Sequence, residues 1–94
     1  MDDRINVRSL DALIDFRNHL VQFNEELQDA YKYMHGHVEA IRDDWDDPQY
    51  DRFREAFDEV AEGIQRYLAV TDEHEDHLAE LIERIRYVLE TRLR

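Results

Sequence analysis

The chain has 94 residues, with 24 acidic side chains, 12 basic ones and no cysteine. This length suits one domain, so residues 1–94 are expected to form a single unit, and without cysteine neither disulfides nor thiolate metal ligands can stabilise it. The formal net charge of −12 argues against binding to nucleic acids or anionic membranes, since both are bound mainly through basic side chains.

The beginning of the sequence lacks the basic segment and the apolar run of a signal peptide. No apolar run approaches the roughly 20 residues that a membrane-spanning helix needs. We therefore expect a cytoplasmic protein, with export, if any, by a route that needs no signal peptide.

A first helix is predicted over residues 9–44, with Ser9 as its N-cap. Apolar residues recur in it at alternating steps of three and four, at eight of nine positions. This rhythm is typical of the seam of a helical bundle. Gly36 costs the helix about 1 kcal/mol relative to alanine and is not expected to break it. The stripe consists of Leu13, Phe16, Leu20, Phe23, Leu27, Ala30, Met34, His37 and Ile41.

The turn is predicted at residues 45–48, which read Trp45, Asp46, Asp47 and Pro48. Asp47 can cap the following helix, and Pro48 suits its first position because no N–H is needed there. Trp45 has two possible roles. It can close the core at the turn, or it can anchor a partner protein, since tryptophan is common at binding hot spots.

A second helix is predicted over residues 48–92, with ten apolar residues at the twelve positions of its stripe. The exceptions, Thr71 and His74, are expected to form a polar layer in the core that fixes register or partner choice. A short turn makes the two helices antiparallel neighbours. The stripe consists of Tyr50, Phe53, Phe57, Val60, Ile64, Tyr67, Thr71, His74, Leu78, Leu81, Ile85 and Val88.

The apolar surface of both helices is wider than the seam of one hairpin requires, because further apolar residues flank each stripe. Such breadth is typical of a four-helix bundle, where each helix meets two neighbours. We therefore predict an all-α fold, an antiparallel two-helix hairpin that completes a four-helix bundle by dimerisation. The partner is expected to be a second copy or a related hairpin. The expected interface residues are Tyr31, Val38, Phe53, Phe57, Leu68, Ile82 and Leu89.

Five histidines raise the question of a metal site. His74 and His77 lie three residues apart among carboxylates, but no histidine follows a glutamate by three residues, as in di-iron bundles. The polar-layer interpretation of His74 is favoured, and neither a metal nor a cofactor is expected. No nucleophile with a neighbouring base and no phosphate-binding glycine loop can be found, so the sequence does not predict an enzyme.

The region around Trp45 resembles the WXG helical-hairpin superfamily, small proteins linked to type VII secretion. The matching residues are Trp45-Asp46-Asp47, followed by Phe53 and Phe57 early in the second helix. Asp47 stands where the family has glycine. The family's export signal, a tyrosine followed four residues later by an acid, is missing from all five tyrosines. The resemblance implies dimerisation and a role as secreted substrate, adaptor or partner of a larger effector.

The acidic balance allows a second function of another class. A helix studded with carboxylates can imitate phosphates and mask a basic, nucleic-acid-binding surface of a target protein, as inhibitors from phage or defence systems would. Arginines interspersed among the acids weaken this alternative.

Overall fold

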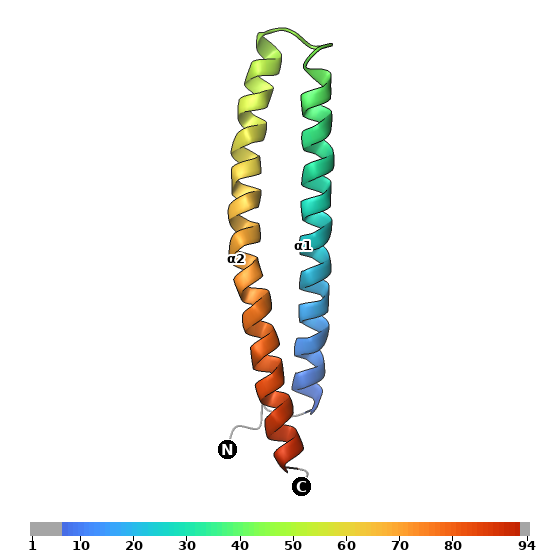
Figure 1. Cartoon of the computed structure of the whole chain (residues 1–94), viewed down its shortest axis with the longest axis vertical. Helices are drawn as coiled ribbons and strands as arrows, with labels where there is room; N and C mark the ends of the chain where they lie inside the picture. The colour runs from blue at the N-terminus through green and yellow to red at the C-terminus, as the bar shows by residue number, and fades with distance from the viewer. Residues whose placement is uncertain (1–6, 93–94) are drawn as a thin grey trace. The chain divides into compact units, whose positions relative to one another are not determined.

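The computed structural model describes residues 7–92. It contains two α-helices, α1 (Val7–Ile41) and α2 (Pro48–Arg92), and no strand among these residues (Figure 1). The predicted helical hairpin is thus present, with the two helices joined through residues 42–47. The second copy that would complete a four-helix bundle remains a prediction.

The contacts of the chain divide it into two units, and both helices run through both. We call Asn24–Val70 the turn unit and the described residues 7–23 and 71–92 the terminal unit. Each unit pairs a part of α1 with a part of α2 in antiparallel fashion.

The helix limits follow local chemistry. Ser9, expected as an N-cap, lies inside α1, which already includes Val7. At its other end α1 stops at Ile41, three residues before the expected limit. The chain tightens there: the Arg42 N–H donates to the Glu39 carbonyl at 3.3 Å and the Asp44 N–H to the Ile41 carbonyl at 3.0 Å, each reaching back three residues and not the four of an α-helix. Gly36 does not interrupt the helix.

The start of α2 is fixed by Asp47. Its carboxylate accepts hydrogen bonds from the backbone N–H groups of Gln49 at 2.7 Å and Tyr50 at 3.3 Å. The Gln49 N–H has no partner within the helix, so the side chain satisfies a donor that would otherwise be lost, while the Tyr50 N–H also donates to the Asp47 backbone carbonyl at 3.1 Å. Pro48 is the first residue of α2, where its missing N–H costs nothing.

Burial shows which residues form the seam between the helices. On α1 the buried residues are Leu10, Asn24 and Val38, which are 9%, 5% and 2% exposed and lie fourteen residues apart. The half-buried residues Arg17 and Tyr31 lie midway between them, which gives a series with a spacing of seven. On α2 the buried residues are Tyr50, Ala61, Thr71 and Ile82. Half-buried residues continue both series at steps of three and four, namely Ile14, Arg17, Val21, Tyr31 and His35 on α1, and Arg54, Phe57, Ile64, Leu68, Glu75, Leu78, Ile85 and Leu89 on α2.

This seam differs from the predicted one on α1. The predicted stripe contains Phe16 and Phe23, both 55% exposed, and Met34, which is 47% exposed. The residues thought to flank it, such as Tyr31 and Val38, face α2 instead. On α2 the predicted stripe divides into two series, each recurring every seven residues. The series that begins at Tyr50 lies in the seam, and the series that begins at Phe53 lies beside it.

Candidate interaction surface

Polar side chains at the seam form hydrogen bonds between the two helices. In the turn unit the Tyr67 hydroxyl donates to the Asn24 side-chain oxygen at 2.9 Å. In the terminal unit the Arg17 guanidinium donates to the backbone carbonyl of Glu75 at 3.0 Å. Asn24 is 5% exposed, so its polar group must be satisfied inside the hairpin, and the bond to Tyr67 does this.

The predicted polar layer needs a correction. Thr71 is buried, at 4% exposure, but His74 is exposed. Three residues turn a helix by about 300°, which carries His74 some 60° away from Thr71 and off the seam. The buried polar residue that sequence reasoning missed is Asn24, because its neighbour Phe23 was assigned to the seam in its place.

Trp45 lies half-buried at the turn. Its ring meets Tyr50 edge-on, with centroids 5.6 Å apart, and lies 6.0 Å from Phe53. Its indole N–H donates to the Asp47 carboxylate at 3.2 Å. The tryptophan therefore covers the open end of the turn unit, and the carboxylate that caps α2 also holds the indole in place.

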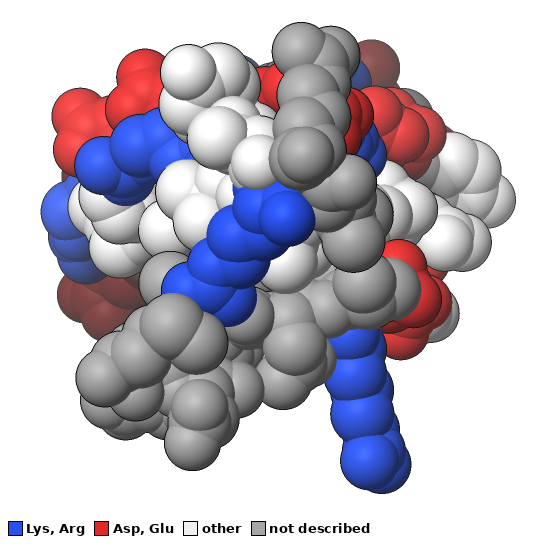
Figure 2. Space-filling model, turned by 90° about the horizontal axis from the view of Figure 1, so that it is seen from below, with Lys and Arg blue, Asp and Glu red and all other residues white. Residues whose placement is uncertain are grey.

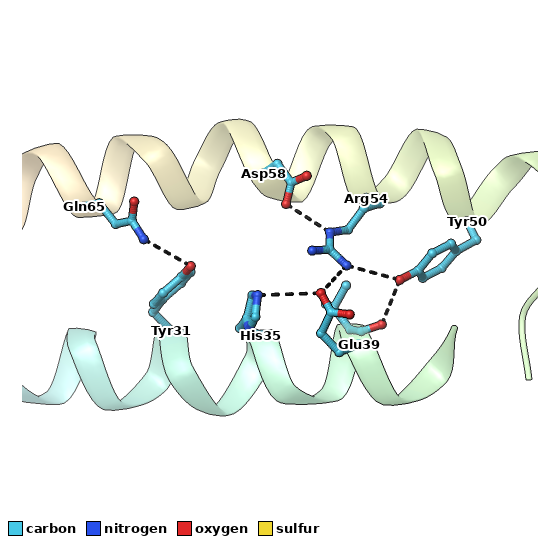
Figure 3. A network of polar contacts seen from close by, with 8 residues as sticks. Tyr31, His35, Glu39, Tyr50, Arg54, Asp58 and Gln65 are labelled. Carbon is cyan, nitrogen blue, oxygen red and sulfur yellow. Dashed lines mark hydrogen bonds and ion pairs between the residues drawn. The ribbon is translucent and has the colours of Figure 1, made fainter. Parts of the chain in front are cut away.

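A polar network crosses the turn unit on one side of the seam (Figure 3). The Arg54 guanidinium forms ion pairs with Glu39 of α1 at 2.5 Å and with Asp58 at 3.0 Å. It also donates to the Tyr50 hydroxyl at 3.5 Å, and that hydroxyl donates to the Val38 carbonyl at 3.0 Å. The hydrogen bond to Tyr50, followed by those to Asp58 and Glu39, raises the pKa of Arg54 above its usual value.

In the turn unit one series of seam residues recurs every seven residues on each helix. We call these the seven-spaced seam residues: Asn24, Tyr31 and Val38 on α1, and Tyr50, Phe57 and Ile64, continued by Thr71, on α2. The residue that follows each of them within the turn unit is polar. In two antiparallel helices, moving the same number of residues along each chain from the seam leads to the same side of the pair. These positions therefore form one side of the hairpin. The ion pair between Glu39 and Arg54 bridges the helices there. The polar side comprises Glu25, Lys32, Glu39, Asp51, Asp58 and Gln65.

The opposite side of the turn unit is apolar. It consists of two kinds of position: three residues after a seven-spaced seam residue, and one residue before it. By the same geometry, both kinds of position lie on one side of the hairpin. We call this set the turn-unit apolar face. Nine of its eleven residues are exposed, Val60 at 60% and Val70 at 54%. The face comprises Leu27, Ala30, Met34, His37, Ile41, Phe53, Ala56, Val60, Gly63, Tyr67 and Val70.

The terminal unit follows the same pattern by itself. The equivalent positions include Phe16 and Phe23, each 55% exposed, and Val88 at 36%. Two histidines, an arginine and a serine accompany them. The equivalent set is Ser9, Leu13, Phe16, Leu20, Phe23, His74, His77, Leu81, Arg84 and Val88.

The residues expected at an interface divide between the seam and this surface. Val38 and Ile82 are 2% and 6% exposed, so the hairpin itself already covers them. Phe53, at 39% exposure, is the one that lies on the turn-unit apolar face. The other four are half-buried in the seam: Tyr31, Phe57, Leu68 and Leu89.

Other kinds of site find no support in the described part of the chain. No three His, Asp or Glu side chains of residues 7–92 are arranged to hold a metal ion. None of the described helices has a stretch apolar and long enough to span a bilayer. In the view of Figure 2, acidic and uncharged side chains lie among the basic ones of the described residues.

Comparisons of the chain with family models, with curated proteins and with solved structures give no significant match.

Proposed function

We propose that this chain is a non-enzymatic protein-binding module that docks another helical protein surface against its apolar side. The observation that carries the proposal is the turn-unit apolar face, where Met34, Val60 and Val70 are each about half exposed or more. Contiguous apolar surface of this kind is characteristic of binding sites in soluble proteins. The face lies on two regular helices, which suits a helical partner.

The likeness of the Trp45 turn and of Phe53 and Phe57 to WXG hairpins supports a more specific form of the proposal. In that form the chain serves type VII secretion as a substrate, an adaptor or the partner of a larger effector. These roles differ in whether the chain itself leaves the cell. Detection of the chain in culture medium, with a cytosolic marker retained in the cells, would favour the substrate role.

Site-specific photocrosslinking in cells tests the binding module. Val60, which is 60% exposed on the turn-unit apolar face, is replaced by benzoyl-phenylalanine. The matched control carries the same group at Lys32, which is exposed and belongs to the polar side, opposite that face. We expect protein adducts from position 60 and few from position 32. Equal yields at both positions, or none at either, would contradict the proposal.

The acidic inhibitor is the alternative, and the net charge of −12 favours it. Its binding surface would be the polar side, but there Glu39 and Asp58 are already paired with Arg54. The two functions differ in salt dependence. A complex with a basic target weakens steeply as salt rises, whereas an apolar interface does not.

A further inference from the structure

A glycine lies within the turn-unit apolar face. Gly63 is half-buried in α2, and its neighbours one turn away along the helix are Val60 and Tyr67 on the face and Glu59 and Arg66 at its edge. No glycine of the described residues has a positive φ, so Gly63 has an ordinary helical backbone conformation. The backbone therefore does not require a glycine at this position.

The packing of the hairpin does not require a glycine there either. Apart from the adjacent residues and the helix's own backbone, a Cβ at Gly63 would have one atom within 4 Å, the Arg66 Nη2 at 4.0 Å, which is ordinary van der Waals contact. Alanine would therefore fit, and alanine favours a helix more than glycine does. An open space thus lies on the face where a side chain would fit and would stabilise the free hairpin.

The position of this space distinguishes Gly63 from the other glycine. Gly36 also lies inside a helix and has nothing within 4 Å of a Cβ. It is exposed, however, and lies outside the turn-unit apolar face, with Lys32 and Glu39 about one turn away. The space at Gly36 opens beside charged side chains, whereas the space at Gly63 adjoins the exposed side chain of Val60. Of the two, only the space at Gly63 suits an apolar group of a partner.

The groups around Gly63 differ in chemical character. Val60 and Tyr67 present apolar surface, at 60% and 39% exposure. Arg66 presents a guanidinium on a side chain that is 74% exposed, and its ion pair with Glu62 is long, at 3.9 Å. An aromatic ring complements both, because its body is apolar and its face attracts a guanidinium. An aliphatic side chain would use the apolar surface alone, and a carboxylate would use the guanidinium alone.

We propose that an aromatic side chain on a helix of the partner occupies the space at Gly63, with its ring beside the Arg66 guanidinium. This inference rests on the proposed function and states which chemistry the turn-unit apolar face recognises. Tryptophan, tyrosine and arginine are common among the residues that contribute most to binding. Because Gly63 has no side chain, the ring and the helix that carries it can approach α2 closely.

The photocrosslink at position 60 locates the partner's residue. Val60 lies one turn from Gly63, and mass spectrometry of the adduct maps the residue to which the benzoyl-phenylalanine attaches. We expect a helical segment in which a phenylalanine, tyrosine or tryptophan lies within about one turn of the attachment point. A segment without such a residue overturns the inference and leaves the binding module standing, whereas the absence of any adduct contradicts the binding module itself.

Gly63→Ala should change binding and stability in opposite directions. The probe is the purified protein that is captured at position 60. We expect Gly63→Ala to weaken its complex with the chain by about fivefold or more, because the methyl group occupies the space that the ring needs. The same substitution should raise the urea midpoint of the chain alone. The matched control, Gly36→Ala, should also raise the urea midpoint and should change the affinity by no more than about twofold.

A double-mutant cycle tests the contact between the ring and Arg66. Arg66→Gln, and replacement of the mapped aromatic residue by leucine, should each weaken the complex by about twofold to fivefold or more. The two changes together should weaken it by less than the product of the single effects, because both remove the same contact. Independent effects in this cycle, or equal affinities of the two glycine variants, overturn the inference.

Discussion

The Tyr50 hydroxyl links the beginning of α2 to the end of α1, and Tyr50→Phe removes that link alone. Tyr50 is 5% exposed, and its hydroxyl donates to the Val38 carbonyl at 3.0 Å while accepting from Arg54 at 3.5 Å. A net hydrogen bond contributes about 1 kcal/mol, and the long bond to Arg54 adds less. We expect the free energy of unfolding to fall by about 1–1.5 kcal/mol, which lowers the Tm of a chain of this size by roughly 4–10 °C.

Urea and thermal unfolding, followed by circular dichroism, measure this change at one fixed protein concentration, because self-association would itself raise the apparent stability. Tyr33→Phe is the matched control: it deletes the same hydroxyl from a residue that is 70% exposed, so its effect should stay within about 0.5 kcal/mol. If the two variants unfold alike, the Tyr50 bond does not stabilise the hairpin and the reasoning is refuted.

Two further substitutions probe the turn unit. Asp47→Ala removes the acceptor that binds the N–H groups of Gln49 and Tyr50 and should cost about 1 kcal/mol in urea unfolding, with Asp47→Ser recovering most of it; an unchanged midpoint would contradict the cap. Arg54→Gln should lower stability, and about 1 M salt should shrink the difference. Because the pKa of Arg54 is raised in the folded chain, the stabilisation that it contributes is complete below the usual arginine pKa and is lost only above it. The difference in unfolding free energy between the wild type and Arg54→Gln should therefore stay constant from about pH 6 to 9. A decline of this difference as the pH rises in that range would contradict the assigned network.

The helices and the turn could be predicted from sequence because the signals are local. Two glycines and one proline interrupt little of the chain, and Asp47 followed by Pro48 marks the start of α2 through capping chemistry that needs no distant contact. The early end of α1 at Ile41 could not be read in this way. It depends on the tightening of the chain there, where the N–H groups of Arg42 and Asp44 bond to carbonyls three residues back.

The choice of seam was the harder problem. Counting apolar residues favours the stripe with Phe16, Phe23 and Met34, but the hairpin closes through a series that includes Arg17 and Asn24. A seam between only two helices is narrow, so long polar side chains can leave their head groups at its edge while their stems pack inside. Periodicity alone cannot distinguish which of two overlapping stripes a neighbouring helix covers.

This inversion is the physical reason to expect a partner. Within the described residues the buried apolar side chains are Leu10, Val38, Tyr50, Ala61 and Ile82, and no large side chain is fully buried. A core of that size contributes little against the conformational entropy lost by ordering two helices of 35 and 45 residues. Meanwhile Phe16, Phe23 and Met34 in the most apolar stripe of α1 are each about half exposed. The seam therefore includes polar side chains such as Arg17 and Asn24, while apolar side chains such as Val60 and Val70 stay exposed beside it. On that exposed surface we propose that a partner binds.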